Sequence, residues 1–418
     1  MISSPTALTP EDIMDITGQL YVAVSIFCLF VIAFAYLGYP VLIYAFSKIF
    51  GQTKDPQYLA DEALPSIALL IAAHNEEKDI RARIENALAM DYPADRLTIV
   101  IASDGSTDGT NDIVREYLVT GRVRLLEFSS NRGKAAVLDS AVPSLDCDLV
   151  VLSDANTTMR TDAVRRLASW FVDPKVGAVC GRLVLTDPKT GTNVDSIYWK
   201  YETFLKKCES KLGALLGSNG AIYAIRKSLF PGVPPGTIID DFYIPLEAKR
   251  RSGCQIVYDS HAVACEETAP NIRAEFRRRV RIGAGGFQII SRLWKLLLPA
   301  NGWVAFAFLC HKLLRWFCPF LMIVAFLANL LALDSTTGSW LFAMQLVGYS
   351  LAIVGNWVPA RPRALKLLKV PTMFVSMNIA LLVGFFQWLF IRQSGVWQRT
   401  ERATPMAAPQ SLLEKVTV

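Results

Sequence analysis

A carboxylate and an amide side chain follow a predicted buried strand near the middle of the chain. The stretch 148–158 reads DLVVLSDANTT, and the apolar run from Leu149 to Leu152 is typical of a strand buried on both faces of a sheet. Asp154 and Asn156 come directly after it. Ligands bind beyond the carboxyl ends of strands in open α/β sheets, and two hard oxygen donors there suit a divalent cation shared with a diphosphate. The plainer alternative is a turn in which one of the two residues caps the next helix.

A second carboxylate, Asp104, lies just past another predicted strand, in the stretch ASDGSTDGT. Ser106, Thr107 and Asp108 are suited to cap the following helix, so helix capping explains them. Asp104 is not needed as a cap. In a tight turn it is free to accept a hydrogen bond from a base or a ribose hydroxyl, and we favour ligand binding for it.

Polar residues also follow the first predicted strand and begin a later helix. Asn75 and Glu76 leave the first strand at the same edge of the sheet, where an N-cap and a charge complementing a helix dipole are the alternatives. Lys134 begins a helix, so it could anchor a phosphate beside N-terminal N–H groups, or be an ordinary solvated lysine. The sequence contains no P-loop and no GxGxxG after a strand, so ATP hydrolysis and NAD binding lack support.

Two adjacent carboxylates, Asp240 and Asp241, open a further predicted helix. Such a pair is usually one helix cap and one solvated charge. Deep in a cleft, however, one of them can take the proton of a hydroxyl nucleophile. Glu266 and Glu267 are the rival candidates for that base.

The elements that must position these residues alternate between short apolar runs and amphipathic stretches. This succession predicts an α/β fold with a mostly parallel sheet and helices on both faces. The predicted strands are 67–72, 97–102, 123–128, one beginning at Asp148, and 176–185. The predicted helices are 76–90, 107–118, one beginning at Gly133, 161–171, one ending near Lys211, and 240–251. Beyond Asn193 the pattern is looser.

Composition indicates a soluble middle flanked by membrane spans. Hydrophobic residues make up 52% of the 418 residues, and the excess lies in 19–50 and 303–391. The net charge of +6 is modest, and the basic residues gather near the membrane-adjacent segments. Membrane lipid, rather than nucleic acid, is therefore the expected partner. The eight cysteines form no CxxC pair, which argues against a zinc site and fits a reducing cytoplasm.

The apolar stretch 20–46 is long enough to cross a bilayer and lacks the features of a signal peptide. No Lys or Arg precedes Lys48, so the positive-inside rule places the middle domain in the cytoplasm. Downstream, a basic run begins near Arg273 and an amphipathic interfacial helix is predicted over 283–298. Further spans are predicted over 316–333, 339–358 and 371–391.

The predicted topology contains one conflict. Three spans after a cytoplasmic domain place the C-terminus outside, whereas the basic tail residues favour the inside: Arg392, Arg399, Arg402 and Lys415. If the tail is inside, one apolar segment is re-entrant or interfacial. The predicted organisation is an N-terminal segment 1–18, a membrane helix 19–47, an α/β domain 60–270, basic and interfacial helices 271–315, about three membrane helices within 316–391, and a tail 392–418.

Seven stretches between residues 66 and 288 resemble, in family order, the membrane-bound family 2 glycosyltransferases, a group that includes poly-N-acetylglucosamine, cellulose and hyaluronan synthases. They are AAHNEEKDI, ASDGSTDGT, NRGKAAVLDSA, VVLSDANTTM, GSNGAIYAIRKSLF, IIDDF and FRRRVRIGAGGFQ. Each motif alone is weakly specific, but seven in order are a strong signal. The resemblance implies a GT-A fold, a nucleotide-sugar donor, Mg²⁺ or Mn²⁺, inversion at the anomeric carbon, and a multi-pass protein of the inner membrane.

The resemblance also implies roles for residues on the donor side. Asp104 would contact the nucleobase, and Asn75 and Glu76 would line the nucleotide pocket. Lys134 would lie near the donor phosphates. Such a protein acts on a nucleotide-sugar, usually UDP-linked, with a glycan or polyprenyl-linked acceptor, and an export or co-polymerase partner is a further expectation.

Metal and acceptor roles follow from the same resemblance. Asp154 and Asn156 fall on the DxD motif, whose last residue usually binds the metal; asparagine there is a neutral ligand. Asp241 falls on the general base of the TED-like motif, with Asp240 at its Glu. The residues that fall where the family meets the acceptor are Ser218, Asn219 and Gly220.

The largest departure from the family pattern is at the QxxRW motif, whose Trp lies at the mouth of the polymer channel in processive synthases. Residues 278–282 read RRVRI. Arg281 keeps the Arg of the motif, which the resemblance implies holds the diphosphate leaving group, and Arg278 is a further donor-side candidate. The Gln and the Trp are absent. Addition of a single sugar to a lipid-linked acceptor therefore has as much support as processive extrusion.

Three other functions compete with this interpretation. A polyprenyl-phosphate glycosyltransferase suits the basic run at Arg277, but leaves the Asp240–Asp241 pair without a role. A sugar nucleotidyltransferase should carry a Gly-rich N-terminal loop, which this sequence lacks. A non-enzymatic membrane scaffold or transporter leaves the aspartates after the strands unexplained, and no span carries the central carboxylates typical of transporters. The donor sugar, acceptor and linkage stay open.

Overall fold

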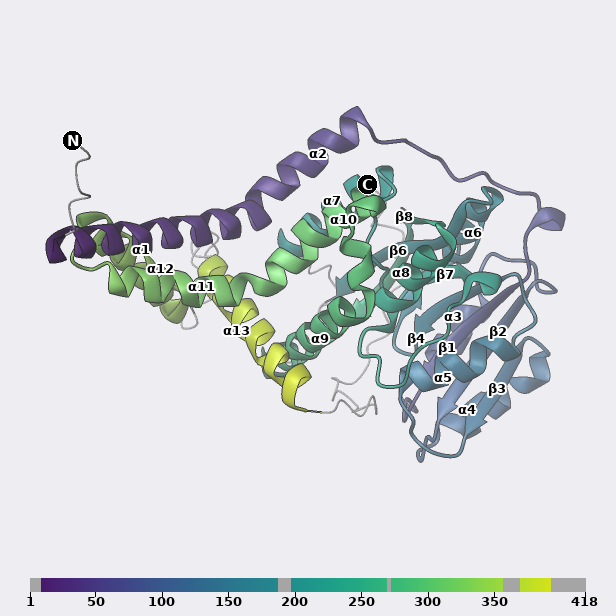
Figure 1. Cartoon of the computed structure of the whole chain (residues 1–418). Coiled ribbons are helices and arrows are strands. Elements are labelled where there is room, and N and C mark those ends of the chain that lie inside the picture. Colours follow the sequence, from purple (N-terminus) through teal and green to yellow (C-terminus); the bar gives the residue numbers. More distant parts are fainter. Residues whose placement is uncertain (1–8, 187–196, 269–271, 356–368, 392–418) are drawn as a thin grey trace. The chain divides into compact units, whose positions relative to one another are not determined.

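The computed structural model describes residues 9–186, 197–268, 272–355 and 369–391 (Figure 1). The chain divides into two compact units. One unit contains the sheet and comprises, within the described residues, Leu42–Glu275, Gly285–Phe308 and residues 390–391. The other unit contains most of the long apolar helices and comprises the chain up to Val41, Phe276–Ala284 and Leu309–Leu389.

The first unit is built on a mixed, mostly parallel sheet, which confirms the predicted α/β class. The eight described strands run in the order β3-β2-β1-β4-β7-β6-β8-β5. Strands β3, β2, β1 and β4 are parallel neighbours, and β7 inserts antiparallel between β4 and β6. The bounds are β1 Ile67–Ala73, β2 Leu97–Asp104, β3 Val123–Phe128, β4 Leu149–Asp154, β5 Thr158–Met159, β6 Val176–Thr186, β7 Tyr223–Arg226 and β8 Gln255–Glu267.

Helices follow the strands as the alternating pattern predicts. They are α3 Ile80–Leu88, α4 Thr110–Glu116, α5 Lys134–Ala141, α6 Ala163–Ser169, α7 Ile197–Lys211 and α8 Asp240–Ser252. The prediction that a helix begins at Glu76 is wrong, because residues 74–79 form turns in which Asn75 has a φ of 55°. The helix predicted from Thr107 likewise begins only at Thr110.

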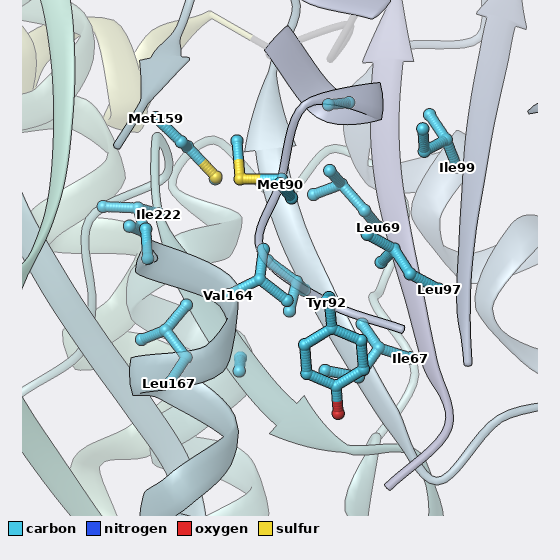
Figure 2. Packing of buried hydrophobic residues seen from close by; sticks show 14 of the residues in the cluster. Ile67, Leu69, Met90, Tyr92, Leu97, Ile99, Met159, Val164, Leu167 and Ile222 are labelled. Atoms are coloured by element: carbon cyan, nitrogen blue, oxygen red, sulfur yellow. The ribbon is translucent and has the colours of Figure 1, made fainter. Parts of the chain in front are cut away.

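The main core lies on one face of the sheet. Ile67 and Leu69 of β1 pack there with Met90 at the end of α3 and with Val164 and Leu167 of α6 (Figure 2). All seven residues of β1 are buried, as expected for a central parallel strand. Burying a side chain of this size contributes roughly 1.5–3 kcal/mol, so the core fixes the strands whose ends carry the polar residues.

Strands β7 and β8 were not predicted from the sequence. β7 has only four residues, too few for a clear periodicity. β8 is long, but its apolar pattern is interrupted at Asp259, where the register against β6 shifts. The Asp259 carboxylate accepts a hydrogen bond of 2.7 Å from the His261 N–H and so stabilises this irregularity.

Within the described residues, four helices are long and apolar enough to cross a membrane: Met14–Ile49, Trp303–Leu331, Thr336–Val354 and Lys369–Phe390. The second begins at Trp303, whereas the sequence predicted an interfacial segment up to residue 315 and a span only from Trp316. The amphipathic helix α9 is also longer than predicted and runs Ile272–Leu293. Parts of the predicted organisation lie outside the described residues: positions 1–8, the end of the span 339–358, and the basic tail from Arg392.

Candidate functional site

The candidate site begins at the carboxyl ends of β1, β2 and β4. These three strands are parallel neighbours, with Ala73 paired to Ser103 and Ala72 paired to Asp154. The residues that follow them therefore leave the sheet at one edge. The fold brings Asn75, Glu76, Asp104 and Asp154 to this edge, as the sequence predicted.

Lys134 joins two of the predicted carboxylates. Its ammonium lies 2.6 Å from Asp154 Oδ1 and 3.7 Å from Asp240 Oδ2. Burial alone would lower the pKa of Lys134, but the Asp154 and Asp240 carboxylates outweigh burial and raise this pKa above its usual value. Lys134 therefore stays protonated and holds the end of β4 against the start of α8. A solvated lysine, the alternative from the sequence, is not what the structure contains.

Asp241 lies beside Asp154 at the start of α8. The Gly220 N–H donates a 2.9 Å hydrogen bond to Asp241 Oδ2. A Cβ built on Gly220 would be 3.4 Å from that oxygen and 3.6 Å from Asp154 Oδ2, so the two carboxylates flank one point. Burial first, and the Asp240 charge second, raise the pKa of Asp241 to about 6, with Lys134 opposing the shift. A carboxylate with such a pKa is suited to accept a proton near neutral pH.

The predicted acceptor segment holds the first turn of α8. The N–H and the hydroxyl of Ser218 both donate to the Asp241 carbonyl, at 3.0 and 2.7 Å. Asn219 donates to the Gly181 carbonyl at 2.7 Å and accepts a hydrogen bond from the Lys206 ammonium. Together with the Gly220 N–H, these contacts place the predicted acceptor residues directly beside the predicted base.

The Asp104 carboxylate was predicted to be free to bind a ligand, but in the structure it is occupied by backbone hydrogen bonds. It is fully buried (0% exposed), and its oxygens accept hydrogen bonds of 2.9 Å from the Arg132 N–H and 2.7 Å from the Gly133 N–H. His74 Nδ1 contacts the Asp104 carbonyl at 2.7 Å, and His74 Nε2 contacts Asn131 Nδ2 at 3.0 Å. Asp104 therefore fixes the loop that delivers Lys134 to the site.

Asn75 and Glu76 connect the loop after β1 with the loop after β2. The Asn75 side-chain oxygen accepts a 2.8 Å hydrogen bond from the Thr107 N–H, and the Asn75 N–H donates to Ser106 Oγ at 3.1 Å. The Glu76 N–H donates to Thr110 Oγ1 at 2.9 Å. Asn75 tolerates its left-handed φ better than most residues. It does not cap α3, so the N-cap alternative is wrong.

Two buried residues near Asp154 are functional candidates that were not predicted from the sequence. Arg83 of α3 is 2% exposed and donates to Ser153 Oγ at 3.1 Å; burial lowers the pKa of Arg83 to about 10, and Asp154 opposes this. The sequence does distinguish Arg83, because this arginine interrupts the apolar face of its helix. Tyr223 is fully buried, and its hydroxyl has no hydrogen-bond partner among the described residues. Nothing in the sequence distinguishes this tyrosine.

The loop before α8 is held by the C-terminal half of α9, which the sequence presented only as an interfacial helix. Gln288 accepts a 3.1 Å hydrogen bond from the Ile238 N–H and donates to the Gly236 carbonyl at 2.8 Å. The Arg292 guanidinium donates to Thr237 Oγ1 at 2.5 Å. These contacts set where α8, and with it Asp240 and Asp241, begins.

The remaining predicted residues lie on other elements. Arg278 and Arg281 are on the part of α9 that belongs to the second unit, and Arg281 is exposed; their roles stay predictions. Glu266 and Glu267, the rival bases, end β8. Glu266 accepts a 2.7 Å hydrogen bond from Thr157 Oγ1.

A divalent cation fits the donor set at this edge. No group of three or more His, Cys, Asp or Glu side chains in the described part of the chain could hold a metal alone. Mg²⁺ and its analogues commonly take one or two carboxylates and complete their shell with water and substrate phosphates. Asp154 supplies one carboxylate, Asn156 lies partly exposed in the following turn, and Asp240 Oδ2 has no hydrogen-bond partner among the described residues. These ligands suit a cation shared with a diphosphate.

Comparison with solved structures supports the fold. The chain is similar to a mannosyltransferase from Pyrobaculum calidifontis solved in complex with GDP-Man and Mn²⁺, with a TM-score of 0.69 and 22% sequence identity. The likeness covers 88% of this chain and 99% of that protein. At this level of identity it establishes the fold alone.

Sequence comparison identifies the domain. The chain is 27% identical over 255 residues to a poly-beta-1,6-N-acetyl-D-glucosamine synthase of Staphylococcus aureus (strain COL), covering 58% of this chain and 60% of that protein. The Staphylococcus epidermidis protein of the same name is 26% identical over 243 residues, covering 55% and 57%. The chain thus spans about three-fifths of the length of these curated relatives. The model of the glycosyl transferase family 2 matches residues 68–230, and we conclude that the chain carries a family 2 glycosyltransferase domain.

Proposed function

We propose that this protein is a membrane-embedded inverting glycosyltransferase. It moves a sugar from a nucleotide-sugar to a growing exopolysaccharide or a lipid-linked glycan. The observation that carries the proposal is the meeting of Asp154, Lys134, Asp240 and Asp241 at one edge of the sheet. Two of them, Asp154 and Lys134, lie within residues 68–230, which match the family 2 model. The names of the staphylococcal relatives support a polysaccharide product, and the mannosyltransferase complex supports a nucleotide-sugar with Mn²⁺.

On the donor side, the chain binds and neutralises a diphosphate. Lys134 is protonated and lies at the start of α5, where its ammonium and the neighbouring N–H groups can bind phosphate oxygens. Asp154 and Asn156 would hold Mg²⁺ or Mn²⁺, which supplies positive charge to the departing diphosphate when bound. Arg281 and Arg278 are the further candidates for binding the leaving group.

The nucleoside part of the donor would lie against the loops after β1 and β2. Asn75 and Glu76 line this region, and the hydrogen bond between Asn75 and Thr107 keeps the two loops together. Asp104 keeps the loop of Lys134 in place through two backbone hydrogen bonds. Its role toward the nucleobase is therefore at least partly indirect.

On the acceptor side, Asp241 removes a proton from the attacking hydroxyl. The raised pKa of Asp241, about 6, still lies below neutral pH, so the carboxylate is ionised there, and it is more basic than an ordinary aspartate. Ser218, Asn219 and Gly220 adjoin Asp241 and are placed to orient the acceptor. A base and a leaving group on opposite sides of the anomeric carbon give a single displacement, which inverts its configuration.

Placement of the active site in the cytoplasm follows from the charge pattern of the sequence. The first candidate membrane helix ends at Ile49, and Lys48 is the first basic residue. The positive-inside rule then puts the following domain on the cytoplasmic side, where activated sugars are made. An inner-membrane location, contact with membrane lipid, and an export or co-polymerase partner belong to the same proposal.

The missing Gln and Trp of the QxxRW motif favour single addition to a polyprenyl-linked acceptor as a second candidate beside polymerisation. Transfer to polyprenyl phosphate itself would need no base, because a phosphate oxygen is already ionised. That variant would leave Asp241 without a role as a base.

The test is a transfer assay on the purified full-length protein with Mn²⁺. Radiolabelled UDP-N-acetylglucosamine, UDP-glucose and GDP-mannose are each supplied with membrane lipid extract as the source of acceptor. We expect label from one of them in a glycan or in a solvent-extractable lipid, and product size separates polymer from single addition. Absence of transfer from every donor, with a folded protein that binds none of them, would overturn the proposal.

A further inference from the structure

Tyr223 lies on the site side of the sheet. In the register of β7 it pairs with Leu152 of β4. Directly paired residues project from the same face, and Asp154, two residues beyond Leu152, shares that face. The neighbour of Tyr223 in the chain, Ile222, points the opposite way into the core (Figure 2).

The Tyr223 hydroxyl is a buried donor without a partner, and it faces carboxylates. The acidic groups that act on it are Asp240, Asp241 and Asp154, which add to burial in raising the pKa of the phenol well above its usual value. Asp240 Oδ2 is also buried and has no hydrogen-bond partner among the described residues. A buried polar atom is costly unless it is paired. A buried donor and a buried acceptor that both lack a hydrogen bond in one site indicate that the two atoms are used in another state.

Donor binding would change the charge balance around Asp240. In the structure, Asp240 has the Lys134 ammonium 3.7 Å away as its compensating charge. Under the proposed function, on which this inference rests, Asp154 would hold the metal ion and Lys134 would bind the diphosphate. Two other cations near the carboxylates already make hydrogen bonds: Lys206 of α7 with Asn219, and Arg83 of α3 with Ser153. Cys180 of β6, a further titratable neighbour of the carboxylates, is kept neutral because burial raises the pKa of its thiol.

We propose that Tyr223 is a positioning residue for the proposed reaction: once the nucleotide-sugar is bound, its hydroxyl donates a hydrogen bond to Asp240 in place of Lys134. This bond holds the first turn of α8 in the orientation in which Asp241 accepts the proton of the acceptor. Tyr223 itself touches neither substrate nor metal.

The test compares Tyr223→Phe with Tyr92→Phe. Tyr92 is also buried, but its hydroxyl already donates a 2.6 Å hydrogen bond to the Pro65 carbonyl, at the opposite edge of the sheet from the site. Both variants are measured as full-length protein with whichever of UDP-N-acetylglucosamine, UDP-glucose and GDP-mannose the wild type transfers. The readouts are kcat, the KM for that donor, and Tm.

Tyr223→Phe should lower kcat about tenfold or more, the effect of losing a hydrogen bond to a charged group. Its donor KM should stay within about twofold of the wild type, and its Tm should not fall, because no hydrogen bond is lost in the ligand-free state. Tyr92→Phe should show the reverse, a lower Tm with kcat unchanged. A double variant, Tyr223→Phe with Asp240→Asn, should lose little more than Asp240→Asn alone, because the two groups act as a pair.

The outcomes separate this inference from the proposed function. If the wild type transfers none of the three sugars, the proposed function fails and the inference fails with it. If the wild type transfers sugar but Tyr223→Phe keeps kcat within about twofold, only the role of Tyr223 is overturned. A loss of kcat accompanied by a lower Tm, or fully additive losses in the double variant, would show a merely structural residue and overturn it as well.

Discussion

Replacing Asp241 by Asn should change activity and stability in opposite directions. Asn keeps the shape of the side chain and an oxygen that can still accept the hydrogen bond from the Gly220 N–H. It removes the charge and the ability to take a proton. General-base catalysis contributes about 10²–10⁴-fold, so turnover should fall by that factor while donor binding is spared.

The stability change follows from the raised pKa of Asp241. Burial and the Asp240 charge raise this pKa from 3.8 to about 6, so ionisation of Asp241 disfavours the folded state. At 1.36 kcal/mol per pKa unit, the wild type loses about 3 kcal/mol as the pH rises from below 4 to above 6. The free energy of unfolding of Asp241→Asn should therefore exceed that of the wild type by about 3 kcal/mol at pH 8. At pH 5 the difference should be about half as large.

The assay combines single-turnover transfer with thermal unfolding at pH 5 and pH 8. Asp162→Asn is the control with the opposite sign. Although burial would raise the pKa of Asp162, hydrogen bonds from Arg160 and Arg166 lower it, so the charge of Asp162 stabilises the fold. This variant should unfold at a lower temperature at pH 8 and keep its turnover. Near wild-type turnover in Asp241→Asn, or a lower Tm for it at pH 8, would refute the reasoning.

Three further predictions follow from the site. Asp154→Ala should weaken donor binding in the presence of Mn²⁺ and leave donor binding without metal little changed. Calorimetric titration of the donor with and without Mn²⁺ checks this. Equal losses of affinity in both conditions would count against Asp154 as a metal ligand. Transfer measured as kcat/KM between pH 5 and 8 should fall about tenfold per pH unit below about 6, as Asp241 becomes protonated, and a flat profile would exclude Asp241 as the base. Asp104→Ala leaves the Arg132 and Gly133 N–H groups unpaired, so it should lower the free energy of unfolding by about 1–3 kcal/mol and raise the donor KM. An unchanged Tm would disprove that Asp104 holds the loop of Arg132 and Gly133.

The sheet edge could be predicted because its determinants are local. The unbroken apolar run of β4 indicates burial on both faces, and the polar residues after it mark where the strand ends. Since parallel strands end at one edge, Asp104 and Asp154 could be placed at the same edge without a structure. The start of α8 at Asp240 was equally clear, since two carboxylates follow an apolar pair.

Partners across the sheet could not be predicted in the same way. That Asp104 binds two backbone N–H groups depends on how the loop around Gly133 folds, where a φ of 87° requires glycine. Tyr223 has an ordinary strand sequence around it, and only the insertion of β7 between β4 and β6 brings its hydroxyl to the carboxylates. The hydrogen bonds of Gln288 and Arg292 to the loop before α8 join segments about fifty residues apart. Hydrophobic periodicity predicts no contacts over such a sequence separation.

The stereochemistry of transfer tests the central claim most directly, because a base and a leaving group held on opposite sides of one carbon permit a single displacement. The measurement is NMR of the first product formed by the wild type from an α-linked nucleotide-sugar, read from the one-bond carbon–proton coupling at the anomeric centre. The account predicts a β-linkage. An α-linkage would contradict it, since retention requires a second displacement or a front-side mechanism for which Asp241 is not the base.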